Sequence, residues 1–140
     1  MISSEDKLER LYNFCLDLDN GPFGLWVNGL FSVVPGSGYF EEFHEKKEAF
    51  FYLLERLLEE GRVVLDVPGD IEYSSTKVRA QDGYTDIWDE SVEVMVSYMR
   101  KTFPADAQHE YDSVLTDYWY SAACPHIGWV HPETGELVFS

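Results

Sequence analysis

FEEFHEKKEAFFYLLERLLEE, residues 40–60, is the stretch that decides the fold, and Gly61 follows it directly. At helical spacing its large apolar side chains fall on one broad stripe, while most of its glutamates occupy the opposite side. Gly61 predicts the end of this helix, because glycine readily takes the left-handed conformation that follows many helices. Such an apolar stripe is unfavourable in water, so we predict that the rest of the chain packs around it. The stripe consists of Phe40, Phe43, Phe50, Phe51, Leu53, Leu54, Leu57 and Leu58.

Two segments precede this central helix. Ser3 or Ser4 can cap a first helix that runs to about residue 19 and has Cys15 on its apolar face. Residues 23–34 are ambiguous, because they suit either a short helix or an irregular apolar segment packed on the central helix. Residues 35–38, Pro-Gly-Ser-Gly, predict a loop.

Strand signals occur mainly in the second half of the chain. Residues 63–67 are rich in β-branched side chains and predict a strand, whereas residues 69–85 predict a loop with at most a short strand. Residues 127–131 and 136–139 predict a C-terminal hairpin, because the intervening Pro-Glu-Thr-Gly favours a turn. Two strands alone are marginally stable, so we expect the strand after Gly61 to pair with this hairpin.

Two more helices are predicted between these strands. One begins at Thr85 or Asp86 and ends at Phe103, because Pro104 cannot continue a helix. A weaker helix is predicted over residues 106–116. The chain therefore predicts a single α+β domain, residues 1–140, in which three to four helices pack on a small antiparallel sheet that includes the C-terminal hairpin.

Charge is the strongest compositional signal. The chain has 26 acidic and 10 basic residues and a formal net charge of −16. Such a charge repels nucleic acid and anionic membranes and attracts basic proteins, although it also serves solubility alone. No stretch of about 18 apolar residues predicts a membrane span, and the mixed, acidic amino terminus does not resemble a secretory signal. We therefore predict a cytoplasmic protein that binds neither nucleic acid nor membranes.

The sequence has few groups that suggest a metal site. His44 and Glu48 imitate part of a zinc-protease helix, but that motif needs a second histidine four residues after the first. Cys124, His126 and His131 are close in sequence, yet their spacing matches no common set of metal ligands. We predict no metal and no other cofactor.

The two cysteines, Cys15 and Cys124, are far apart in the sequence. Thiols in a chain without a secretory signal usually stay reduced, although a bridge between the two is left open. Cys15 is predicted to be a core residue. Cys124 as a nucleophile would need a thiolate in an electropositive pocket, which so acidic a chain disfavours. No catalytic residue is predicted.

An acidic segment gives the one candidate binding site. Asp86, Asp89, Glu90 and Glu93 follow helical spacing and would share one face of the predicted helix, with Asp82 just upstream. A solvated face explains this pattern, and acidic residues are favourable at a helix start. A binding site for a basic partner is the alternative, and Glu93 supports it because it would lie about two turns into that helix.

Two stretches resemble a bacterial family known as domain-of-unknown-function family 596. They are KKEAFFYLLERLLEEGRVVL around the central helix and CPHIGWVHPETGELVF at the carboxyl end. The resemblance rests on Phe50-Phe51, the Leu57–Gly61 exit into a strand, and the Cys124-Pro125 hairpin. It implies a fold but no catalytic residue. Some members look like immunity proteins, which are small acidic partners of bacterial toxins.

The resemblance and the charge together lead to one expectation and two alternatives. We expect an immunity protein that neutralises a basic toxin, such as a nuclease, by occlusion through the acidic segment. The first alternative is a small enzyme of the hydrolase type that uses carboxylates or Cys124. The second is a structural or oligomerising protein, and a homodimer is compatible with each of these functions.

Overall fold

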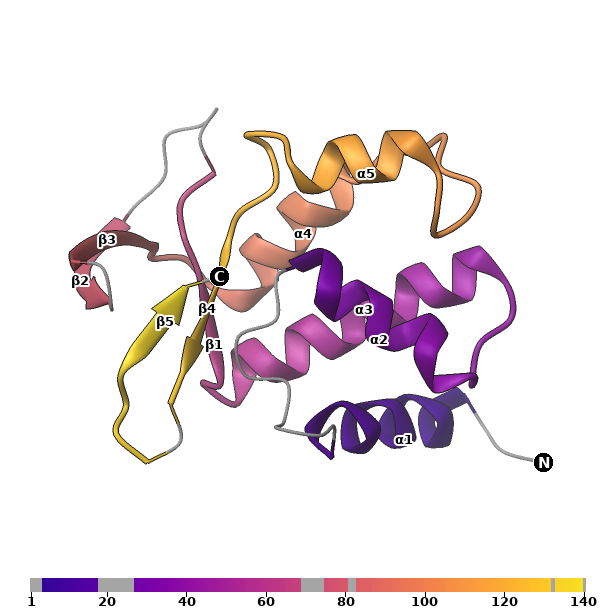
Figure 1. Ribbon diagram of the computed structural model, residues 1–140, viewed down its shortest axis with the longest axis horizontal. Helices are drawn as coiled ribbons and strands as arrows, with labels where there is room; N and C mark the ends of the chain where they lie inside the picture. Colours follow the sequence, from indigo (N-terminus) through magenta and orange to yellow (C-terminus); the bar gives the residue numbers. More distant parts are fainter. Residues whose placement is uncertain (1–3, 18–26, 69–74, 81–82, 132, 140) are drawn as a thin grey trace.

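The computed structural model describes residues 4–17, 27–68, 75–80, 83–131 and 133–139. Within these ranges the chain forms a group of helices beside short antiparallel strands (Figure 1). The elements in chain order are α1 (Ser4–Leu16), α2 (Val27–Ser37), α3 (Phe43–Glu59), β1 (Val63–Leu65), β2 (Ser75–Ala80), β3 (Gly83–Trp88), α4 (Val92–Thr102), α5 (Ser113–Trp119), β4 (Ile127–Val130) and β5 (Leu137–Phe139). This confirms the predicted α+β class, with one helix more than predicted.

Helix α3 is the central element, as its apolar stripe predicts. It runs through the middle of the helical part, and α1, α2 and α4 all pack against it (Figure 1). Gly61 has a φ of 72°, and its N–H donates to Leu58 O over 3.1 Å, which closes the helix in the predicted way. The buried residues of α3 are Ala49, Phe50, Phe51, Leu53, Leu54, Leu57 and Leu58.

Aromatic rings fill the space between the helices. The ring centroid of Phe50 lies 5.3 Å from that of Phe31 on α2 and 5.8 Å from that of Trp119 on α5. Phe103, just after α4, joins the cluster at 5.8 Å from Phe51. These separations are typical of favourable edge-to-face and tilted ring pairs. The cluster therefore holds α2, α3, α4 and α5 together.

The predicted pairing of strands is confirmed. Strands β1, β4 and β5 form an antiparallel sheet in the order β1-β4-β5, with Val63 opposite Trp129 and Gly128 opposite Phe139. In the turn between β4 and β5, Gly135 has a φ of 73°, which glycine adopts without strain. The C-terminal hairpin is therefore the middle and one edge of the sheet.

The prediction of a loop with at most a short strand over residues 69–85 is wrong for the residues of this range that the structure describes. Strands β2 and β3 form a separate antiparallel hairpin, in register from Ser75 opposite Trp88 to Ala80 opposite Gly83. An isolated bridge between Asp66 and Ile87 connects this hairpin to the end of β1. The residues that pair in this hairpin come from both sides of residues 81–82, so the pairing depends on contacts between two segments and not on the pattern of one segment.

Three helix boundaries differ from the predictions. The ambiguous segment forms α2, which continues through Pro35 to Ser37, so the predicted loop starts too early. Helix α4 begins at Val92 and not at residue 85 or 86, because the chain is still extended in β3 and Ser91 Oγ caps the helix by accepting from Val94 N. Helix α5 likewise begins after its cap, Asp112, and not at residue 106.

Candidate functional site

The structure separates the acidic residues that the sequence placed on one helix face. Asp82 lies outside the described residues, and Asp86 is in β3, opposite Lys77 in the register. Asp89 and Glu90 lie between β3 and α4, and only Glu93 belongs to α4, in its first turn. The prediction of a shared helical face is therefore wrong. The partner-binding role of these residues stays a prediction.

Packing of α4 on α3 brings other carboxylates toward Glu93. Burial raises the pKa of Glu55 on α3, and the nearby Glu59 and Glu93 raise it further, while Arg100 opposes them. The spacing of residues along one predicted helix could not reveal this grouping, because Glu55 and Glu93 belong to different helices. Glu55, Glu59 and Glu93 form this group, and Asp89 and Glu90 precede Glu93 directly before the start of α4. We call these five residues together the α3–α4 acidic surface.

The α3–α4 acidic surface has an excess of negative charge around the start of α4. No lysine or arginine occurs in the sequence between Arg79 and Arg100. The Arg100 guanidinium also donates to the Glu48 carboxylate over 2.6 and 2.8 Å, so its charge is shared with another glutamate. Like charges held near one another repel, and a cation placed between them relieves that repulsion. The surface is thus suited to cationic groups of another molecule.

A groove of about 460 Å³ between α2 and α5 is a second candidate site. The side chain of Tyr111 is 85% exposed at its rim and that of Tyr120 is 66% exposed. The Tyr120 hydroxyl lies 3.5 Å from Asn28 Nδ2, so it reaches from the end of α5 to α2. This α2–α5 groove was not predicted from the sequence. The signal for it is the segment YDSVLTDYWY, residues 111–120, which has more aromatic side chains than one short helix can bury.

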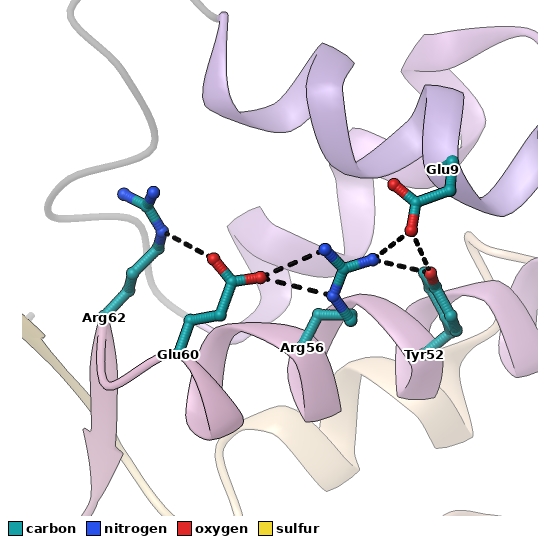
Figure 2. A network of polar contacts seen from close by, with 5 residues as sticks. All are labelled: Glu9, Tyr52, Arg56, Glu60 and Arg62. Carbon is teal, nitrogen blue, oxygen red and sulfur yellow. Dashed lines mark hydrogen bonds and ion pairs between the residues drawn. The ribbon is translucent and has the colours of Figure 1, made fainter.

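A network of polar side chains connects α1 to the carboxyl-terminal half of α3 (Figure 2). The Arg56 guanidinium donates to the Tyr52 hydroxyl over 2.7 Å, to the Glu9 carboxylate, and to Glu60 Oε2 over 3.1 and 3.2 Å. Arg62 Nε lies 3.5 Å from the other oxygen of Glu60. Because Arg56 uses its donors within the protein, the network stabilises the fold and does not present a ligand site.

Cys124, the thiol named in the enzyme alternative, is buried, whereas the ring of the nearby His126 is exposed. Cys124 is 4% exposed, and burial, with a smaller contribution from Asp66, raises the pKa of its thiol to about 12. The ring of His126 is 71% exposed, and its Nδ1 lies 2.8 Å from Asp66 Oδ2. His131 Nδ1 accepts from the backbone N–H of Glu133 over 3.2 Å. The thiol therefore lacks the polarised, accessible setting that a nucleophile needs.

Both cysteines should resist alkylation in the folded protein. Both are free thiols, Cys15 is fully buried, and burial raises the pKa of Cys15 to about 11. Because the thiolate is the reactive form, we expect iodoacetamide at about pH 8 to label either thiol at least about 100-fold more slowly than in urea-unfolded protein. Mass spectrometry of timed samples measures both rates. Rapid labelling of Cys124 alone in folded protein would contradict this prediction and favour the enzyme alternative.

The described residues contain no group of three or more His, Cys, Asp or Glu side chains arranged to hold a metal ion. None of the helices in the described part of the chain has the length and apolar character needed to cross a membrane.

Comparison with known proteins identifies the fold and no activity. No family model matches the chain, and no curated protein matches it significantly. A solved structure from Neisseria meningitidis, described as an uncharacterised protein conserved in bacteria, aligns with a TM-score of 0.63 and 23% sequence identity. The alignment covers 96% of this chain and 87% of the Neisseria chain. The fold is therefore one that also occurs in this Neisseria protein.

Proposed function

We propose that this protein acts by binding a basic protein, as an immunity protein that neutralises a cognate bacterial toxin by occlusion. The net charge of −16 and the resemblance of the central helix and the C-terminal hairpin to a family with immunity-like members support this function. The buried Cys124 and the outward-facing His126 do not favour the enzyme alternative. In this proposal the protein acts in the cytoplasm, where it protects the cell that makes it.

The grouping of Glu55 on α3 with Glu59 and with Glu93 on α4 is the observation that carries the proposal. The Glu55 carboxylate is partly removed from water and close to the other two, and both effects raise its pKa. Such an arrangement disfavours the ionised form in the free protein. Lysine or arginine side chains of a partner would lower the pKa of Glu55 again. The relief of the repulsion between the carboxylates would then contribute to the free energy of binding. A purely solvating surface has no need to hold carboxylates close together across two helices.

The proposed mechanism is electrostatic steering followed by occlusion. A basic toxin domain, of which a nuclease is the clearest class, carries a cationic surface for the phosphates of its substrate. Carboxylates of the α3–α4 acidic surface, together with Asp82 and Asp86, would pair with that surface in place of phosphate. Charge complementarity of this kind raises association rates by about 10- to 1,000-fold.

Charge reversal of Asp89, Glu90 and Glu93 to lysine tests the proposal. The partner is first captured from the source cells with the wild-type protein and eluted with a salt gradient. We expect the triple variant to associate with this partner about tenfold more slowly at low ionic strength, with little change in dissociation. The difference should shrink at high salt, because salt screens exposed charges. Stopped-flow fluorescence measures both rates.

A matched control separates the site from net charge. Glu41→Lys, Glu133→Lys and Glu136→Lys change the net charge equally at exposed positions outside the α3–α4 acidic surface. We expect this control to retain most of the association rate. Equal slowing in both variants would contradict the site, and failure of the wild-type protein to capture any basic protein would contradict the function. Thermal unfolding checks that each variant folds.

A further inference from the structure

The two walls of the α2–α5 groove differ in charge. Helix α2, which forms one wall, has no charged residue in its sequence VNGLFSVVPGS. The other wall contains one acidic lining residue, Glu110, and the sequence has no lysine or arginine after Lys101. Further acidic residues occur next to the lining residues in the chain, in and just before α5, namely Asp106, Asp112 and Asp117. The groove thus joins an uncharged, largely apolar surface to a segment rich in acidic residues.

Aromatic rings line the groove and remain open to solvent. Trp119 forms part of the lining and packs on Phe31 with ring centroids 5.5 Å apart, so its position is held by the core. Tyr111 and Tyr120 stand at the rim and are the exposed large aromatic side chains of the described residues. Exposed tyrosine beside a partly buried tryptophan is typical of the anchoring positions of protein interfaces.

Hydrogen bonds lower the pKa of two carboxyls at and beside the groove. Backbone N–H groups of Gln108 and Val114 donate to Asp112, which lowers the pKa of that carboxyl. A backbone hydrogen bond lowers the pKa of Glu110, and Lys46 lowers it further, with its Nζ 3.2 and 3.3 Å from the two carboxylate oxygens. Lys46 offsets part of the charge at Glu110, while Asp112 and Asp117, next to lining residues in the chain, add negative charge beside the groove.

Arginine is the side chain that best fits these features. Its guanidinium is planar and weakly hydrated and stacks on aromatic rings, while its aliphatic stem packs on apolar surface. Lysine carries the same charge, but its compact ammonium is more strongly hydrated and cannot stack. A phosphate-bearing ligand would be repelled by the acidic wall. A second copy of this chain would bring another net charge of −16, which disfavours self-association.

We propose that the α2–α5 groove binds an arginine side chain presented by a loop of a basic partner protein. The guanidinium stacks on Tyr111 and Tyr120, its charge faces the α5 wall, and its stem packs along α2. The groove is a second contact surface, distinct in its residues from the α3–α4 acidic surface. The inference rests on the proposed function only in that the partner is a basic protein.

A titration with peptides tests the groove without the partner. Nuclear magnetic resonance of ¹⁵N-labelled protein is recorded with the blocked hexapeptide (Gly-Arg)₃ and with (Gly-Lys)₃, which has the same charge. We expect saturable shifts at Tyr111, Tyr120 and the Trp119 indole with the arginine peptide, and binding at least about threefold weaker with the lysine peptide. Equal binding of both peptides, or shifts spread over acidic residues without saturation, would overturn the proposal.

Variants of the rim identify the role of the rings. Tyr111→Ala with Tyr120→Ala should weaken (Gly-Arg)₃ binding about tenfold, whereas Tyr111→Phe with Tyr120→Phe should retain it, because stacking needs the ring and not the hydroxyl. Val94→Ala removes another exposed apolar side chain, on α4, and should leave binding unchanged. Unchanged binding in the alanine double variant would overturn the proposal. Shifts of rim residues that depend on protein concentration alone would also overturn it, in favour of a second copy as the occupant.

The captured partner distinguishes failure of this inference from failure of the proposed function. If the groove is used, the alanine double variant should raise the dissociation constant for the partner about tenfold or more. A partner that binds the wild-type protein and the alanine variant equally would overturn the groove and leave the proposed function intact. Absence of any basic partner would contradict the proposed function, while the peptide titration would still decide the groove.

Discussion

Replacing Phe50 by alanine should lower the free energy of unfolding by about 3–5 kcal/mol. The Phe50 side chain is fully buried at the centre of α3, and its ring contacts those of Phe31, Phe51 and Trp119. Alanine would remove these contacts and leave a cavity that three other helices can only partly close. Urea unfolding followed by tryptophan fluorescence measures the change, and the melting temperature should fall by roughly 10–15 °C.

Phe43→Ala is the matched control for the core. Phe43 is at the start of the same helix and only partly buried, with its ring centroid 6.3 Å from those of Phe31 and Phe103. We expect a loss of about 1 kcal/mol, because the site is open to solvent and creates no enclosed cavity. Equal losses at the two positions would show that the aromatic cluster is not organised around Phe50.

Replacing Arg56 by methionine should destabilise the protein by about 2 kcal/mol, with the effect concentrated at α1. Methionine keeps much of the apolar stem but removes the hydrogen bonds to Glu9, Tyr52 and Glu60. It also removes the contact of the guanidinium with the Tyr12 ring, whose centroid lies 4.2 Å from the guanidinium carbon. Hydrogen bonds to charged groups contribute more than neutral ones, although exposure of Glu9 reduces their net effect here. Hydrogen exchange should show faster opening of α1 than of α4.

Arg62→Met is the control for the polar network. Arg62 makes one contact in the network, with Glu60 at 3.5 Å, and its side chain is 46% exposed. We expect its removal to change stability by less than about 0.5 kcal/mol and to leave hydrogen exchange of α1 unchanged. If both variants had the same small effect, the network would be a surface feature and not the attachment of α1 to α3.

The two proposed contact surfaces lie where different elements meet. The α3–α4 acidic surface combines the carboxyl-terminal half of one helix with the start of another, and the α2–α5 groove lies between helices 76 or more residues apart in the sequence. Each combines negative charge with a feature that solubility alone does not require. In the α3–α4 acidic surface this feature is the closeness of the carboxylates, and in the α2–α5 groove it is the exposed aromatic rings. The proposed binding of a basic protein would account for both.

The sequence by itself determined the elements whose signals are local. The stripe of α3 follows from side-chain spacing along one helix, and the ends at Gly61 and Gly135 follow from the backbone conformations that glycine accepts. The C-terminal hairpin was predicted for the same reason, since its turn residues are contiguous. The pairing of β1 with this hairpin also follows from the sequence, because two strands alone are marginally stable.

Only the tertiary structure decided what depends on pairing between distant segments. The β2–β3 hairpin forms by pairing of two segments, and its second strand continues past the predicted start of α4. That shift separated Asp86 from Glu93, while packing of α4 on α3 brought Glu93 toward Glu55. The groove also depends on packing, because Tyr111 and Tyr120 become a rim only when α5 lies beside α2. Charge and aromatic content are properties of the sequence, but their grouping into surfaces is a property of the packed helices.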